Sequence, residues 1–156
     1  MRALILSDTH GYPNKLLDAL KVAGDCDVLV HLGDGRRDLL SVRPYVNADV
    51  VEVRGNNDFS SDNLPEYRII EICGQKVFCC HGHLLGVREG LKGLASAAER
   101  NGCSVALFGH THEVADETVD GVRCLNPGSI GYPMGAKAVI EVTEGAEGAN
   151  FNFIYL

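Results

Sequence analysis

Short apolar runs recur along the chain, and each ends abruptly in a cluster of Gly, Asp, Asn or His. Uninterrupted apolar runs of this kind are typical of strands that are buried on both faces of a sheet. They therefore predict five buried strands, at Ala3–Leu6, Asp27–Leu32, Val50–Val53, Lys76–Cys80 and Ser104–Phe108.

Helical periodicity separates some of these runs. We expect two amphipathic helices, with apolar faces formed by Leu16, Leu17, Leu20 and Ala23 in the first and by Leu91, Leu94, Ala95 and Ala98 in the second. Asn14 is a candidate N-cap for the first helix, and Gly102 is placed to end the second. A shorter helix is expected after Asp38, although Pro44 would fall inside it. This alternation of strand and helix predicts a largely parallel sheet.

The other apolar segments favour antiparallel hairpins. The pairs are Tyr67–Ile72 with Lys76–Cys80 around Cys73-Gly74-Gln75, Thr118-Val119 with Val122–Leu125 around Asp120-Gly121, and Ala138–Val142 with Phe151–Tyr155 around a glycine-rich loop. Parallel strand–helix units followed by hairpins predict an α/β fold with two mixed sheets. Because the sequence has no repeat, linker or low-complexity tract, we expect one domain over residues 1–156.

Composition and charge limit the classes of partner. An apolar fraction of 46% is ample for one core, and the net charge of −7 disfavours non-specific binding to nucleic acid or to anionic membranes. No apolar stretch approaches the roughly 20 residues of a membrane-spanning helix. The first apolar run meets Ser7 and Asp8 too early for a signal peptide, so we expect a cytoplasmic protein.

The six cysteines lack the short paired spacing of a zinc site. Several lie inside apolar runs, which favours reduced thiols that pack as small buried hydrophobic residues. His31 also lies inside an apolar run, and we expect a hydrogen-bonded core histidine there.

The polar clusters at the strand ends carry the candidate chemistry. Ligands of open α/β sheets bind beyond the carboxyl ends of the strands, where loops distant in sequence meet. Imidazole, carboxylate and amide groups together suit divalent transition metals. Seven such ligands exceed what one ion needs, so two ions that share a carboxylate are expected, with Asp34 as the natural bridge. The candidate ligands are Asp8, His10, Asp34, Asn56, His81, His110 and His112.

Together these segments resemble the calcineurin-like metallophosphoesterase superfamily. Its ordered signature of Asp-x-His, Gly-Asp, Gly-Asn-(His/Asp/Cys), His and Gly-His-x-His matches the chain from Asp8 to His112. The short length and the sequence Asp8-Thr9-His10-Gly11 are most similar to the small phosphodiesterase subgroup described as YfcE-like or MJ0936-like. The resemblance implies two mixed sheets packed as a sandwich and flanked by helices, in four α/β/β/α layers.

The resemblance also implies roles for individual residues. The first ion would be held by Asp8, His10, Asp34 and His112, and the second by Asp34, Asn56, His81 and His110. Manganese is favoured, with nickel, iron, cobalt or zinc as alternatives. His83 would either touch phosphate or support His81, and support is favoured. Asn126 and Ser129 would shape a loop near the cleft.

Asn57 departs from the family pattern. The family more often has histidine or cysteine there, and the histidine is thought to protonate the leaving group or to bind phosphate. A neutral amide cannot act as a general acid, which would cost on the order of 10²–10⁴ in rate for a poor leaving group. Asp58 would either orient a metal ligand or form a turn.

The function implied is a metal-dependent phosphodiesterase, in which hydroxide activated by two metals attacks phosphate. A non-catalytic metal-binding scaffold of the same fold and a phosphomonoesterase for small metabolites are the alternatives. The substrate would be a small phosphate ester, with cyclic nucleotides, other nucleotide diesters and glycerophosphodiesters all open. Members of the family often associate, and the alternation of Phe151, Phe153 and Tyr155 suits either a homo-oligomer interface or core packing.

Overall fold

Ten strands form two five-stranded mixed sheets in the computed structural model, which describes residues 1–59 and 63–156. The first sheet has the order β10-β9-β1-β2-β3, and the second has the order β4-β5-β6-β8-β7. The strands are β1 (Arg2–Leu6), β2 (Val28–His31), β3 (Asp49–Glu52), β4 (Tyr67–Ile72), β5 (Gln75–Cys80), β6 (Val105–Leu107), β7 (Val114–Val119), β8 (Val122–Pro127), β9 (Ala138–Gly145) and β10 (Gly148–Tyr155).

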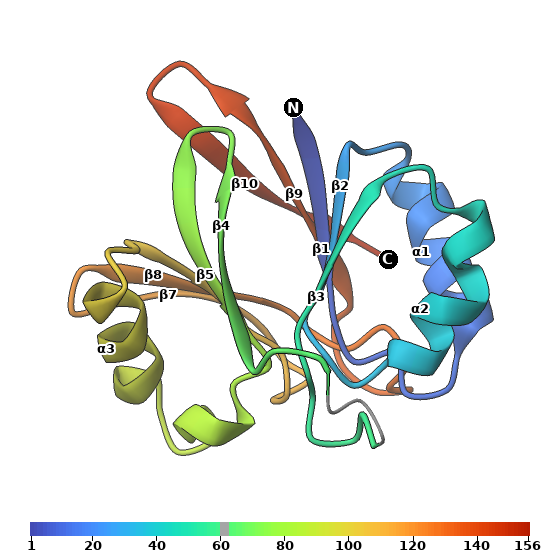
Figure 1. Cartoon of the computed structure of the whole chain (residues 1–156), viewed down its shortest axis with the longest axis horizontal. Coiled ribbons are helices and arrows are strands. Elements are labelled where there is room, and N and C mark those ends of the chain that lie inside the picture. Colours follow the sequence, from blue (N-terminus) through green and yellow to red (C-terminus); the bar gives the residue numbers. More distant parts are fainter. Residues whose placement is uncertain (60–62) are drawn as a thin grey trace.

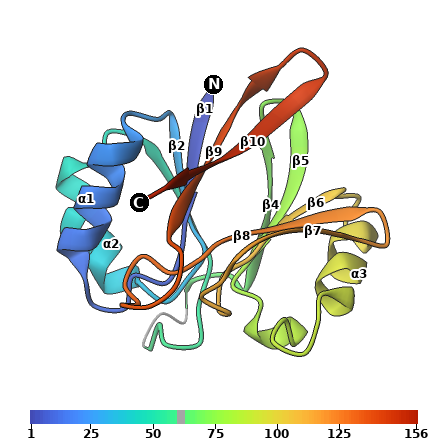
Figure 2. The same ribbon diagram turned by 180° about the vertical axis from the view of Figure 1, so that it is seen from behind.

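Three α-helices cover the outer faces of these sheets. Helices α1 (Pro13–Ala23) and α2 (Arg36–Val42) flank the first sheet, and α3 (Lys92–Arg100) flanks the second (Figure 1). Figure 2 shows the same layering from behind. Two 3₁₀ turns, Arg43–Tyr45 and His83–Leu85, complete the described helical elements. The predicted four-layer α/β/β/α sandwich is confirmed.

The apolar runs are continuous because the strands are buried on both sides. In β1, Ala3 and Ile5 belong to the core between the two sheets, whereas Leu4 and Leu6 belong to the core beneath α1 and α2. A third apolar cluster lies between the second sheet and α3. The alternation of side chains along a strand thus fills two cores at once.

The helix boundaries differ from prediction at two places. Helix α1 begins at Pro13 after Tyr12, so the prediction of Asn14 as its N-cap is wrong; proline at the first helical position is preorganised for the helix. Helix α2 contains Asp38 and ends at Val42, and Pro44 lies in the following 3₁₀ turn.

The hairpin turns follow the predicted glycine dipeptides. Cys73 and Gly74 have φ values of 50° and 74°, and Asp120 and Gly121 have 49° and 82°. Two consecutive positive values are the signature of a tight two-residue turn that matches the twist of the strands. Gln75 opens β5 instead of belonging to the turn.

The cysteines behave as predicted. All six thiols are free, and Cys79, Cys80, Cys103 and Cys124 are buried. Burial raises the pKa of Cys80 to about 12, so this thiol stays protonated and packs as an apolar group. Among the described helices, none is long and apolar enough to cross a membrane.

Candidate metal centre

The ends of β1, β2 and β5, together with the segment after β6, bring acidic and histidine side chains from both sheets together. Two groups of candidate metal ligands result, each with its ligand atoms within 4.8 Å of one another. The first group is Asp8, His10 and His112, and the second is Asp8, Asp34 and His81. These two groups contain five of the seven predicted ligands, and Asp8 belongs to both groups.

Asp8 lies at the middle of this cluster. Its side chain is fully buried, and its Oδ1 has no hydrogen-bond partner in the described part of the chain. The Nε2 atoms around Oδ1 lie at 3.2 Å for His112, 3.4 Å for His10 and 3.9 Å for His81. Oδ2 accepts hydrogen bonds from the Ser7 hydroxyl and from the backbone N–H of His110. An unpaired buried carboxylate oxygen is costly unless a cation or donor satisfies it, so this oxygen fits a metal ligand.

Asp34 faces the cluster from the second strand end. Its Oδ2 lies 3.4 Å from His81 Nε2 and 3.8 Å from His10 Nε2. Although burial opposes ionisation, the His81 ring and the Asn57 hydrogen bonds lower the pKa of Asp34 to about 2. Asp8 is also buried, yet hydrogen bonds from His10 and His112 hold its pKa well below the usual range. Two ionised carboxylates therefore face one another across the site at neutral pH.

The histidines point their Nε2 atoms into the cluster. The Nδ1 of His81 lies 2.7 Å from the Leu32 carbonyl oxygen, to which it donates, and this leaves Nε2 free to bind a cation. That Nε2 lies 3.1 Å from Oδ1 of Asn56. The Nε2 atoms of His10 and His112 lie only 3.0 Å apart. Nitrogen and oxygen donors that crowd together in this way fit divalent transition metals.

His110 and His83 lie beside this cluster. The His110 ring packs edge-on against His81 with a centroid distance of 5.1 Å, although His110 belongs to neither ligand group. The His83 ring lies 5.4 Å from His81, and its buried Nδ1 has no hydrogen-bond partner among the described residues. The metal role of His110 and the supporting role of His83 stay predictions.

The backbone of the site is strained. Asp8, His10, Asp34, His110 and His112 all have positive φ values, between 48° and 66°. Left-handed conformations cost free energy in non-glycine residues and concentrate at functional sites, where the surrounding structure enforces them. Gly109 permits the tight packing, because an added Cβ would overlap the Ser7 hydroxyl and Oδ2 of Asp8.

Asp58 fixes the loop that carries Asp34. Its carboxylate accepts hydrogen bonds from four backbone N–H groups, those of Asp34 at 2.8 Å, Gly35 at 3.0 Å, Arg36 at 3.0 Å and Gly55 at 2.9 Å. The side chain therefore caps α2 from a neighbouring loop. The geometry supports both predicted roles: the contact with the Asp34 N–H orients a metal-ligand loop, and the hydrogen bond from the Asp58 N–H to the Gly55 carbonyl, at 3.3 Å, closes a turn.

Asp38 supports the site, although the sequence indicated only a helix near it. Its Oδ2 accepts hydrogen bonds from the Thr9 hydroxyl at 2.5 Å and from the Gly11 N–H at 2.9 Å. His31 is 2% exposed, and its Nδ1 accepts the Gly33 N–H at 3.2 Å. The predicted hydrogen-bonded core histidine is confirmed.

Asn126 and Ser129 tie the loops together. The Asn126 amide donates to the Gly109 carbonyl at 2.9 Å, and the Ser129 hydroxyl donates to the Asp8 carbonyl at 2.7 Å. Both side chains are buried, in keeping with the predicted role of shaping a loop near the cleft.

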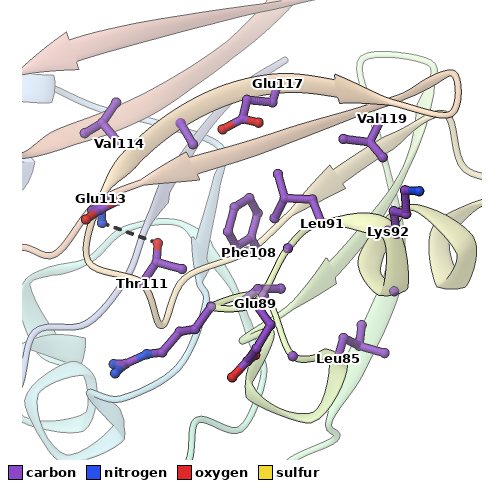
Figure 3. Close-up of a pocket in the computed structure, with 16 residues that line it drawn as sticks. Leu85, Glu89, Leu91, Lys92, Phe108, Thr111, Glu113, Val114, Glu117 and Val119 are labelled. Carbon is purple, nitrogen blue, oxygen red and sulfur yellow. Dashed lines mark hydrogen bonds between the residues drawn. The ribbon is translucent and has the colours of Figure 1, made fainter.

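Cavities surround the cluster. One of about 340 Å³ is lined by His10, Asp34 and Asn57, and another of about 580 Å³ lies beside His112. A third, of about 730 Å³, lies between the loop before α3 and β7, with Phe108 in its lining and the Thr111–Glu113 hydrogen bond at one side (Figure 3). Thr111 and Glu113 line both the second and the third cavities, so the two cavities are neighbours.

A two-sheet α/β sandwich with carboxylates and imidazoles at its strand ends is the architecture of a metallophosphoesterase. The chain belongs to this family, because the model for the calcineurin-like phosphoesterase superfamily domain matches residues 1–145.

Individual relatives also carry metallophosphoesterase or phosphodiesterase names. The chain is 34% identical over 134 residues to a probable metallophosphoesterase, YsnB, of Bacillus subtilis, covering 85% of this chain and 77% of the relative. It is 30% identical over 157 residues to phosphodiesterase MJ0936 of Methanocaldococcus jannaschii, covering 89% of this chain and 90% of the relative.

Solved structures share the fold. The structure of an archaeal phosphodiesterase superimposes with a TM-score of 0.78 and 25% identity, and all of both chains is covered. Vps29 of Entamoeba histolytica, in complex with zinc, has a TM-score of 0.72 and 22% identity over 99% of each chain. The latter likeness shows the fold alone.

Proposed function

We propose that this chain is a metal-dependent phosphodiesterase. The observation that carries the proposal is the Oδ1 atom of Asp8, which is buried without a hydrogen-bond partner among the described residues and faces three imidazole nitrogens. A buried carboxylate oxygen without a partner costs folding free energy, and a bound cation removes that cost. The similarity to a protein named as a phosphodiesterase supports the choice of reaction.

The proposed ligands form two sets that share Asp34, with manganese as the first metal to test. Asp8, His10, Asp34 and His112 make one set, and Asp34, Asn56, His81 and His110 make the other. When bound, two divalent cations supply positive charge for the phosphate oxygens and hydroxide from water at neutral pH. The placement of Asp34 Oδ2 toward both His81 and His10 supports a shared role.

The chain's own groups hold the site in its working geometry. The Leu32 carbonyl fixes the tautomer of His81, and the Ser7 hydroxyl orients the Asp8 carboxylate. Asn57 donates to Asp34 twice, from its backbone N–H to Oδ1 at 2.7 Å and from its amide to Oδ2 at 2.6 Å. Asn57 therefore positions a carboxylate, and a neutral amide does not supply a proton to a leaving group. Without a proton donor at this position, we expect diesters with poor leaving groups to be hydrolysed more slowly than activated nitrophenyl esters.

A non-catalytic metal-binding scaffold of the same fold is the second candidate; the zinc complex of Vps29 shares that fold. Members that have lost catalysis typically lose metal ligands, whereas this chain keeps each residue of the ligand pattern. A complete ligand set supports the enzyme over the scaffold.

The test begins with protein stripped of metal by a chelator. Hydrolysis of bis-p-nitrophenyl phosphate and of p-nitrophenyl phosphate is measured after adding Mn²⁺, Ni²⁺, Co²⁺ or Zn²⁺, with His112→Ala in parallel. We expect diester hydrolysis that metal restores and that the variant loses by at least about 100-fold, since an enzyme without a ligand loses much of its transition-state stabilisation. Metal binding without turnover of either ester would favour the scaffold, and no metal binding would overturn the proposal.

A further inference from the structure

The cavity beside His112 is lined by side chains of different chemistry. Tyr132 and Met134 contribute aromatic and apolar groups, and Arg88 and Glu113 contribute charged groups. Its volume of about 580 Å³ lies within the range of small-molecule sites in proteins. Because His112 belongs to the ligand cluster, the cavity adjoins the place where the phosphate of a substrate would lie.

Tyr132 contributes an aromatic ring to the lining of this cavity. Tyr132 is 46% exposed, and the centroid of its ring lies 5.0 Å from that of His112, at an interplanar angle of 48°. Since the ring is not covered by other side chains on its exposed part, it offers a surface on which a planar group can stack.

The loop that carries Tyr132 is hydrogen-bonded to the backbone of Asp8, one of the candidate metal ligands. The Tyr132 N–H donates to the Ser129 hydroxyl at 2.9 Å, and both that hydroxyl and the Gly131 N–H donate to the Asp8 carbonyl, at 2.7 and 2.9 Å. A Cβ atom at Gly131 would overlap the Thr9 carbonyl, so glycine is needed for this approach. Ser129 is 1% exposed. The backbone that carries the Tyr132 side chain is therefore tied to the backbone of Asp8.

Arg88 contributes a positively charged side chain to the lining of the same cavity. Its Nη2 donates to the His110 carbonyl at 3.1 Å, which places the guanidinium near the cluster. None of the arginine ion pairs in residues 1–59 and 63–156 involves Arg88. Its remaining N–H groups can bind oxygen or nitrogen acceptors of a substrate.

We propose that this cavity binds the nucleoside arm of a nucleotide phosphodiester, with the base stacked on Tyr132 and Arg88 hydrogen-bonded to acceptors of the same arm. The proposal rests on the phosphodiesterase function proposed above and narrows its substrate class. A glycerol or other alkyl arm would leave the aromatic face unused. Stacking of a base on an aromatic ring is sequence-tolerant, so the site would accept more than one base.

The test compares two phosphate compounds that differ by the base, adenosine 5′-monophosphate and ribose 5-phosphate. Both are titrated calorimetrically into the manganese-loaded protein and are used as inhibitors of bis-p-nitrophenyl phosphate hydrolysis. We expect the adenosine compound to bind on the order of 10-fold more tightly. Tyr132→Ala should remove most of that difference and leave ribose 5-phosphate unchanged, whereas Tyr132→Phe should keep it.

Tyr155→Ala is the matched control, because this tyrosine is 63% exposed at the end of β10 and lines none of the cavities described above. Equal binding of the two compounds to the wild-type protein, or equal weakening of both by Tyr132→Ala, would overturn the subsite. Failure of the proposed phosphodiesterase function would give a different result: the wild-type protein would bind manganese without hydrolysing the diester.

Discussion

At the scale of single residues, the site is costly to build. Asp8 combines full burial, a left-handed backbone and a carboxylate oxygen without a partner among the described residues. Each of these features destabilises the folded chain by an amount on the order of 1–3 kcal/mol. They persist because Ser7, Gly109 and Ser129 pack around the residue and fix it. Such strain is consistent with a side chain kept for chemistry rather than for stability.

His31 makes stability depend on pH. Burial lowers the pKa of this ring, so the folded chain keeps it neutral where the unfolded chain binds a proton. The contribution of His31 to the free energy of unfolding is therefore full above the ordinary histidine pKa, and it falls as the pH drops below about 6.5. Between about pH 7.5 and about pH 5.5, we expect the free energy of unfolding to fall by on the order of 1 kcal/mol more in the wild type than in His31→Gln.

Urea unfolding with a chelator present measures this difference without contributions from metal. Because the two proteins differ only at residue 31, the comparison isolates His31. If the free energy of unfolding changed with pH in the same way in both proteins, His31 would not be the source of the pH dependence.

Under the proposed function, we expect Asn57 to limit the leaving groups that the site accepts, because its amide contacts Asp34 and cannot donate a proton as a general acid. Replacing it with histidine, as Asn57→His, puts a titratable donor where the amide now contacts Asp34. We expect kcat/KM for a nucleoside 2′,3′-cyclic phosphate, which has a poor leaving group, to rise by up to about 100-fold relative to bis-p-nitrophenyl phosphate. Asn57→Ala is the control, and an equal change for both substrates would show that no proton donor had been gained.

At the scale of elements, α2 depends on a neighbouring loop for its N-terminus. Gly35 precedes the helix and offers no side-chain cap, so the first N–H groups are satisfied by Asp58 instead. The same carboxylate binds the N–H groups of Asp34 and Gly55 and thereby joins the ends of β2 and β3. One residue therefore sets the geometry of a helix and of a candidate metal ligand.

Asp58→Asn tests this joint role. An amide keeps one acceptor oxygen and loses the charge, so we expect a destabilisation of about 2 kcal/mol in urea unfolding, together with weaker manganese binding. Asp18→Asn is the matched control, because Asp18 is exposed and pairs only with Lys21 among the described residues. An Asp58→Asn protein with unchanged stability would contradict the four hydrogen bonds as a stabilising element.

At the scale of the whole molecule, the candidate ligands come from both sheets. Asp8 and Asp34 follow strands of the first sheet, and His81 follows a strand of the second. A cation held among them would link the two sheets, and it would bind the folded chain only.

Metal should therefore raise the thermal stability. At a free Mn²⁺ concentration 100 times its Kd, we expect about 2.7 kcal/mol of stabilisation, which is roughly 5–10 °C in Tm for a domain of this length. Thermal unfolding followed by circular dichroism with Mn²⁺ or with a chelator measures the shift. His112→Ala should reduce it strongly, and an equal shift in both proteins would place the bound metal elsewhere.

The sequence by itself determined the elements and the location of the candidate chemistry. Buried strands, glycine turns and polar strand ends are local patterns, because side-chain alternation and positive φ values act over a few neighbouring residues. The family signature is likewise read in order along the chain. The N-cap prediction for α1 was wrong because Pro13 and Asn14 both carry helix-start signals, and the helix begins at the proline, whose fixed φ suits the first helical position.

Only the tertiary structure decided which atoms meet. The sequence favoured Asp34 as the shared carboxylate, whereas the folded chain places Asp8 in both ligand groups, and a shared role for Asp34 stays a proposal. The contacts of Asp58 with the α2 loop and of Tyr132 with His112 join segments that are far apart in sequence. Such contacts depend on the packing of two sheets, which no local pattern encodes, and for that reason they could not be predicted from the sequence.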